Sequence, residues 1–278
     1  MAAAESAIEH FSVALKRPAG EVDVDGIVTD CLSGRNLGLF QRGGVQEDDF
    51  IALRALAEVL RPTFYVESGV FRGSSLYALH SCACVDKIWA IDPNLDSLLF
   101  RDDVRGRTTY ESERDFGEVD FGRVPSRSLV YFDDHIDSAR RINEAFRHGF
   151  RALAFDDSTG FYGIGQRLFP AVPSVGMIKH MGSLRAGDVL VWRVANRRWL
   201  SAPWLGKWFP KAVGAWELRF EITETVVAQM KEAAAVIERI LTFPDLREYL
   251  ATRDNRASFD KTKYLVLLKD ERVGEAEE

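Results

Sequence analysis

The 278-residue sequence predicts an α/β protein built on a doubly wound, mostly parallel sheet of the Rossmann-like kind. Short β-rich apolar runs alternate with helical patterns as far as Gly160, and acidic residues stand where several of these runs end. This alternation is typical of parallel sheets, because each parallel strand needs a crossover before the next one. With 46% hydrophobic residues, the chain can also bury a substantial core.

The first predicted helix has apolar residues at helical spacing from Phe50 to Leu60, and Pro62 ends it. Strands are expected at 63–66, 87–91, 108–110, 128–132 and 151–155, with helices at 76–80 and 139–146. Late strands are expected at 189–194 and 264–269, and a long amphipathic helix at 225–241. We expect residues 1–45 to form an N-terminal helical cap on a main domain of residues 46–278.

Charge and composition exclude several classes of protein. Lys and Arg number 36 and Asp and Glu 42, a formal net charge of −6, so nucleic acid is not expected as a partner. The N-terminus carries Glu5 and Glu9, and the chain has no apolar run of transmembrane length, so we expect a cytoplasmic protein. Cys31, Cys82 and Cys84 are too few for a disulfide framework, which predicts buried free thiols.

The first candidate site motif is Glu67-x-Gly69-x-x-x-Gly73, on a predicted strand-to-helix turn. Glycines there permit positive φ and let a ligand approach the backbone near a helix N-terminus. Asp92 ends the next strand, where an acid can bind both ribose hydroxyls of a nucleoside. The dinucleotide fingerprint is absent, which disfavours an NAD-dependent oxidoreductase.

Aspartate pairs end the fourth and fifth predicted strands, as Asp133-Asp134 and Asp156-Asp157. In open α/β sheets ligands bind outside the carboxyl ends of the strands, so these carboxylates can converge on one cation or substrate. Crowded carboxylates repel one another, and either raised pKa values or a hard cation such as Mg²⁺ relieves the repulsion. The alternative is helix N-capping, a role for which Asp137 is the better candidate.

The glycine turn and the acid after it resemble those of class I S-adenosylmethionine-dependent methyltransferases. The resemblance implies that Glu67, Gly69 and Gly73 pass the methionine part of the cofactor and that Asp92 holds its ribose. In that family a residue after the third strand commonly lies beside the adenine. The candidates for this position are Glu113 and Asp115.

The aspartate pairs resemble those of magnesium-dependent O-methyltransferases that act on sugar hydroxyls of macrolide and aminocoumarin antibiotics. This resemblance, over roughly residues 46–160, implies Mg²⁺ bound by Asp133, Asp156 and Asp157. His135 falls at the place of the family's general base, with Asp134 as the second candidate. The implied reaction is methyl transfer to a hydroxyl of a sugar or polyketide-like small molecule. A non-catalytic relative that binds a glycan or a protein is the alternative.

Two further features have open interpretations. Arg140 and Arg141 could neutralise the Asp133 motif, bind an acidic substrate, or form a solvated helix face. The segment from Trp192 to Trp216 holds five of the six tryptophans and several Lys and Arg residues. We expect this aromatic, basic insertion to cover the acceptor site and to suit a glycosylated or anionic acceptor. Its alternatives are contact with a membrane surface, a core-packed subdomain and an interface of a homo-oligomer.

Overall fold

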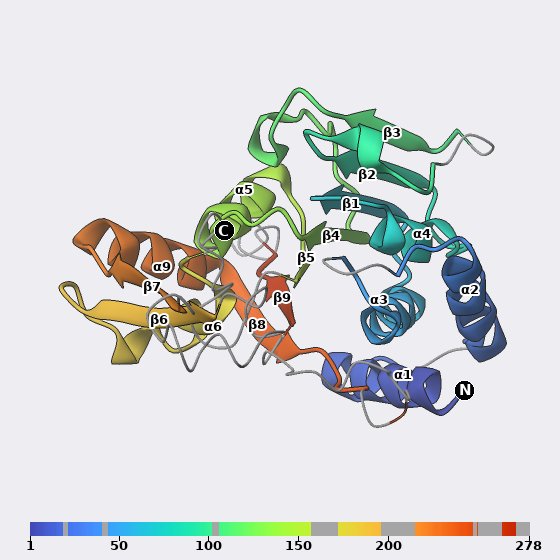
Figure 1. The fold of residues 1–278 in the computed structure, drawn as a ribbon, viewed down its shortest axis with the longest axis horizontal. Helices are drawn as coiled ribbons and strands as arrows, with labels where there is room; N and C mark the ends of the chain where they lie inside the picture. Colours follow the sequence, from blue (N-terminus) through green and yellow to red (C-terminus); the bar gives the residue numbers. More distant parts are fainter. Residues whose placement is uncertain are drawn as a thin grey trace, which may run out of the picture.

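The computed structural model describes residues 1–18, 22–40, 44–101, 106–156, 172–195, 215–246, 249 and 263–270. Its centre is a seven-stranded sheet with the strand order β3-β2-β1-β4-β5-β9-β8 (Figure 1). The strands of this sheet are β1 (Phe64–Ser68), β2 (Lys87–Ile91), β3 (Thr108–Glu111), β4 (Ser128–Phe132), β5 (Ala152–Phe155), β8 (Ile237–Thr242) and β9 (Tyr264–Leu268). Strands β1 to β5 are parallel, and β9 runs antiparallel to both β5 and β8.

The predicted fold class is confirmed. The chain builds the sheet outward from β1 in one direction through β2 and β3, then returns to place β4 on the other side of β1. The strand order therefore reverses between β1 and β4, and such a switch point leaves a crevice at the carboxyl ends of the two strands. A separate antiparallel ribbon consists of β6 (Val189–Ala195) and β7 (Ala215–Glu221).

Helices cover both faces of the sheet (Figure 1). Helices α1 (Ala2–Leu15), α2 (Val24–Asn36), α3 (Glu47–Leu60) and α4 (Ser74–His80) belong to one apolar core, and the other contains α5 (Ser138–His148), α6 (Val175–Lys179) and α9 (Glu224–Val236). Tyr65 and Tyr131 point into the first core, whereas Phe64 and Phe132 point into the second. Alternate residues of one strand thus serve opposite faces, as the pleat requires.

Helix α3 brings acidic residues to the edge of the sheet that carries the crevice. Its first turn contains Glu47, Asp48 and Asp49, whose charges complement the positive end of the helix dipole. Asp49 lies 3.2 Å from Lys263, the residue immediately before β9. The start of α3 therefore lies against the strand ends. The helix ends at Leu60, before Pro62, as the sequence predicts.

The prediction of one helix over residues 225–241 is wrong in its last five residues. Helix α9 ends at Val236, and Ile237–Thr242 form the edge strand β8. Ile237 and Ile240 extend the apolar stripe of the helix, but both are β-branched and both pair with β9, opposite Leu268 and Val266. Pairing with β9 therefore overrides the helical spacing of the sequence.

Other sequence expectations concern thiols and membranes. Cys31, Cys82 and Cys84 are free, and Cys31 and Cys82 are buried while Cys84 is partly exposed. Within the ranges given above, no helix is long and apolar enough to cross a bilayer. The division into an N-terminal cap and a main domain stays a prediction.

Candidate active site

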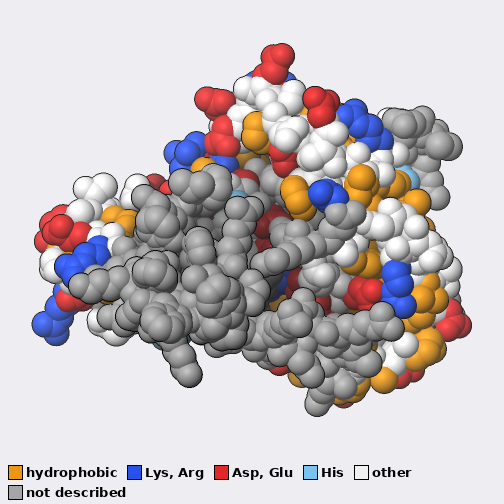
Figure 2. All heavy atoms as spheres, in the orientation of Figure 1, with side chains coloured by type: hydrophobic (Ala, Val, Ile, Leu, Met, Phe, Trp, Pro, Cys, Tyr) orange, Lys and Arg blue, Asp and Glu red, His pale blue; other side chains and the backbone are white. Residues whose placement is uncertain are grey.

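A cavity of about 640 Å³ opens at the carboxyl ends of β1, β2, β3 and β4. This volume lies within the range typical of small-molecule sites. Figure 2 shows acidic side chains in the hollowed centre of the molecule in this view. The cavity lining comes from the last residues of β1 and β2, the turn after β1, the segments that follow β2, β3 and β4, and one residue of α5: Ser68, Gly69, Phe71, Ile91, Asp92, Pro93, Ser112, Glu113, Arg114, Asp115, Asp133, Asp134, His135, Ile136 and Arg141.

The glycine turn has the geometry that the sequence predicts. Gly69 has a φ of +88°, and a Cβ atom on it would lie 2.3 Å from the backbone oxygen of Asp133. Any side chain at this position would therefore separate the turn from the end of β4. Gly73 has a φ of +87° at the N-terminus of α4 and does not line the cavity. Of the two glycines, the structure brings Gly69 to the site.

Asp92 ties the glycine turn to the end of β2. Its Oδ2 accepts hydrogen bonds from the backbone N–H groups of Val70 (2.8 Å) and Phe71 (2.9 Å), and its Oδ1 accepts one from Asn94 (2.8 Å). An ionised carboxylate has about four lone-pair sites, so Asp92 keeps acceptor capacity for a ligand. Because its side chain also lines the cavity, Asp92 suits the ribose-binding role predicted for it.

Glu67 faces the core instead of the cavity. It is fully buried, and its carboxyl oxygens accept hydrogen bonds from the Tyr65 hydroxyl (2.7 Å) and the Ser75 hydroxyl (2.6 Å). Burial raises the pKa of Glu67 to about 8, against the lowering effect of these two donors. The structure thus places Glu67 in the core beneath the glycine turn. Its contact with the methionine part of the cofactor, implied by the resemblance, stays a prediction.

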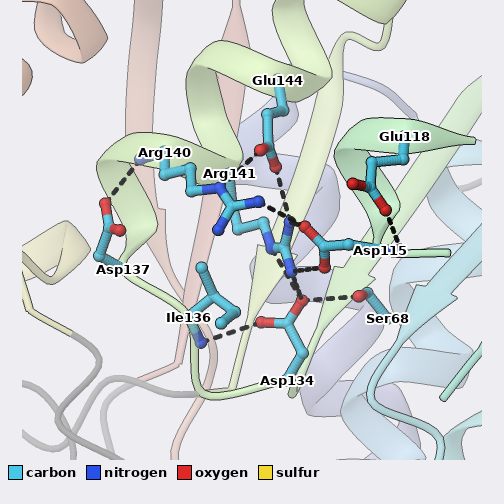
Figure 3. Close-up of polar contacts among 9 residues, drawn as sticks. All are labelled: Ser68, Asp115, Glu118, Asp134, Ile136, Asp137, Arg140, Arg141 and Glu144. Atoms are coloured by element: carbon cyan, nitrogen blue, oxygen red, sulfur yellow. Dashed lines mark hydrogen bonds and ion pairs between the residues drawn. The ribbon is translucent and has the colours of Figure 1, made fainter. Parts of the chain in front are cut away.

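Arg141 links the segments that follow β3 and β4 (Figure 3). Its side chain is 1% exposed, and its guanidinium donates to Asp134 (2.8 Å), Asp115 (2.6 Å) and Glu144 (2.6 Å). Ser68 also donates to Asp134, at 2.6 Å. Of the roles left open for this arginine, neutralising the carboxylates around the Asp133 motif is the one that the structure shows. The same guanidinium also binds Asp115, which lies 26 residues earlier in the sequence.

Asp115 reaches the cavity as an ion-paired residue. It caps the short 3₁₀ helix η2 (Phe116–Glu118) and binds both Arg140 and Arg141. The Arg141 hydrogen bond lowers the pKa of Asp115 below its ordinary value, against the effect of partial burial. Glu113, the other candidate for the adenine side, lines the same wall.

Asp134 and His135 occupy the turn after β4, and both line the cavity. Asp134 is committed to Arg141 and Ser68 and accepts from the Ile136 backbone at 3.1 Å, so it is poorly placed to take a proton. His135 has a φ of +59°, which is uncommon for a residue with a side chain and often marks a functional position.

Asp137 caps α5 by accepting from the Arg140 N–H, which confirms the capping role predicted for it.

The structure does not bring the three predicted metal ligands to one described site. Asp133 lines the cavity, whereas Asp156 forms an ion pair with the buried Lys263. Asp157 and most of the segment 192–216 lie outside the described residues. In the part of the chain that the structure describes, no group of three His, Cys, Asp or Glu residues could hold a metal. These side chains do not fit Mg²⁺ at Asp133 and Asp156, because an ammonium group already contacts Asp156.

Sequence reasoning missed Lys263 altogether. The only local signal is its place immediately before a late apolar strand, and nothing in the sequence pairs that strand with β5.

Comparison with protein-family models and with characterised protein sequences gives no match. Among solved structures, the chain is similar to an O-methyltransferase from Streptomyces achromogenes involved in tomaymycin synthesis, in complex with S-adenosylmethionine, at 14% identity and a TM-score of 0.41, with 69% of this chain and 91% of that one covered. A methyltransferase from Podospora anserina, bound to S-adenosylhomocysteine, has 12% identity and a TM-score of 0.43, with 96% and 97% covered. An O-methyltransferase from Bacillus cereus has 10% identity and a TM-score of 0.40, with 64% and 88% covered.

Proposed function

We propose that this chain is an S-adenosylmethionine-dependent O-methyltransferase acting on a hydroxyl of a small molecule. The observation that carries the proposal is the joint placement of Gly69 and Asp92 in one cavity at the switch point of the sheet. A close backbone turn next to an acid at the following strand end suits a ligand that has a ribose and a chain extending from it.

Different residues of the cavity would bind different parts of such a cofactor. Gly69 would permit close approach of the cofactor along the turn, and Asp92 would accept hydrogen bonds from its ribose hydroxyls. Glu113 and Asp115 form the wall where the adenine would lie. The bound cofactor supplies an electrophilic methyl group, and the protein holds the attacking hydroxyl in line with it.

We propose His135 as the general base that takes the proton of the acceptor hydroxyl. It lines the cavity beside Asp133, and a neutral imidazole is chemically competent for this transfer near neutral pH. Asp134, the second candidate from the sequence, is held by Arg141 and Ser68 and is the weaker choice.

The acceptor remains a sugar or polyketide-like molecule in this proposal, and glycosylated or anionic forms are favoured by the aromatic, basic composition of residues 192–216. The proposed reaction does not need the Mg²⁺ that the resemblance implies, because Lys263 engages one of the three aspartates that would bind it.

Asp92→Ala is expected to weaken binding of S-adenosylhomocysteine by about 10- to 100-fold, because it removes a charged hydrogen-bond acceptor from the cavity. Isothermal titration calorimetry measures the change. The matched control is Asp96→Ala in the nearby 3₁₀ helix η1 (Leu95–Ser97), since Asp96 does not line the cavity. Failure of the wild-type chain to bind S-adenosylmethionine or S-adenosylhomocysteine, with NAD binding instead, would overturn the proposed function.

His135→Asn is expected to lower kcat about 100-fold, since general-base catalysis typically contributes at least that factor. Asparagine tolerates the left-handed backbone at this position, so the substitution changes the imidazole and spares the turn. The pH–rate profile should also lose its acid limb, because asparagine cannot accept the proton of the hydroxyl. An unchanged rate and profile would assign the base to another residue.

A further inference from the structure

Four residues form a row across the edge of the sheet where the strands end. The Asp133 N–H donates to the Ser68 oxygen (2.8 Å), and the Asp156 N–H donates to the Phe132 oxygen (2.9 Å). These bonds continue the ladder one residue beyond β1, β4 and β5. On the far side of β5, Phe155 pairs with Tyr264, so Lys263 follows next to Asp156. The row therefore reads Gly69, Asp133, Asp156, Lys263.

The side chains of this row belong to the face of the sheet that α3 covers. Asp133, Asp156 and Lys263 are each two positions from a residue of that core, namely Tyr131, Ala154 and Leu265. Because the strand period is two, they continue the same face beyond the strand ends. The contacts agree with this, since the Lys263 Nζ lies 3.4 Å from the Tyr131 hydroxyl and 3.2 Å from Asp49 of α3.

Lys263 is a buried cation among carboxylates. Its side chain is 4% exposed, and its ammonium group forms ion pairs with both Asp156 and Asp49. A charge removed from water needs such partners, and carboxylates gathered in one place need a cation in return. The ammonium group of Lys263 therefore relieves the repulsion for which the sequence alone suggested Mg²⁺.

A divalent cation at Asp156 would compete with this ammonium group. A divalent cation on the carboxylate oxygen that Lys263 contacts would lie close to the ammonium group, and two positive charges at contact distance repel each other. Metal binding would therefore have to pull the side chain of Lys263 away from Asp49, Asp156 and Tyr131 together. That movement would leave a buried lysine to find new partners.

We propose that Lys263 is the resident cation of this strand-end site and takes the place of a divalent metal at Asp156. Lys263 is then a positioning residue: it holds the Asp156 carboxylate beside Asp133, which lines the cavity. The part of Lys263 in catalysis rests on the proposed function, because an acceptor hydroxyl would react beside these strand ends only in a methyltransferase. Its structural content can be tested without turnover.

The first test titrates the metal-free full-length protein with MgCl₂ by calorimetry and follows its thermal unfolding midpoint, with and without S-adenosylhomocysteine. The expected result is no saturable binding up to millimolar concentrations and no shift of the midpoint. Once an acceptor is found, turnover should change less than about twofold in EDTA, since the ammonium group already balances the local charge. Saturable Mg²⁺ binding that Asp156→Asn abolishes would overturn the proposal.

The second test removes the ammonium group. Lys263→Met leaves Asp49 and Asp156 without their cation, so MgCl₂ should now raise the thermal midpoint of the variant while the wild type stays unchanged. Lys269→Met, just after the other end of β9, is the matched control and should behave as the wild type. Lys263→Arg keeps the charge and should remain insensitive to Mg²⁺, which gives a folded variant if the methionine variant does not fold.

The two proposals fail in different ways. A wild-type protein that binds neither S-adenosylmethionine nor its product contradicts the proposed function, while the MgCl₂ titrations still report on Lys263. Conversely, cofactor binding accompanied by saturable Mg²⁺ binding at Asp156 supports the function and rejects the role of Lys263.

Discussion

Arg141→Met is expected to lower the free energy of unfolding by about 3–5 kcal/mol, the usual loss when one partner of a buried ion pair is removed. Without the guanidinium, Asp115, Asp134 and Glu144 keep their charges beside one another and lose their shared donor. Affinity for S-adenosylhomocysteine should fall as well, because Asp115 and Asp134 both line the cavity.

The neighbouring arginine provides the control for this experiment. Arg140 also binds Asp115 and Glu144, but its side chain is 46% exposed, so Arg140→Met should lower stability by only about 1 kcal/mol or less. Urea denaturation of the two variants beside the wild type measures the difference. Equal losses would show that burial of Arg141 is not what gives the network its stability.

Glu67→Gln is expected to flatten the pH dependence of stability between about pH 4.5 and pH 8. Burial raises the folded-state pKa of Glu67 to about 8 from an ordinary value of 4.5. In this window the folded protein binds a proton that the unfolded chain has lost, so the free energy of unfolding falls as the pH rises. The fall from this one group amounts to roughly 4 kcal/mol. Glutamine cannot titrate, so the free energy of unfolding of the variant should not show this decrease.

The measurement is a series of denaturation curves across the window for the wild type and the variant, because their difference isolates Glu67 from other titrating groups. Glu238→Gln, at an exposed position of β8, reports the same chemical change at the surface. Affinity for S-adenosylhomocysteine should stay within about twofold in Glu67→Gln, since the side chain faces the core. A large loss of affinity for S-adenosylhomocysteine, with an unchanged pH dependence of stability, would instead indicate that Glu67 contacts the cofactor.

Local patterns were sufficient for much of the fold. The helix that ends before Pro62, the strands at 87–91 and 128–132, and the Asp137 cap each depend on neighbours within a few residues. The glycine turn was equally predictable, because only glycine suits a φ of +88° against the end of β4. Asp133, Asp134 and His135, which line the cavity, could also be found from the sequence, because strand ends carry the ligands in such sheets.

The sequence by itself determined the parallel β/α order, the glycine turn and the positions of acids at the strand ends, since all of these are written in short-range spacing. Tertiary structure alone decided that Glu67 turns into the core, that Arg141 joins Asp115 to Asp134, and that Ile237–Thr242 is a strand. It also brought Lys263 to Asp156 from more than a hundred residues away. The physical reason is that charge balance and strand pairing depend on contacts between residues far apart in the sequence. The spacing of residues along a single sequence does not specify these long-range contacts.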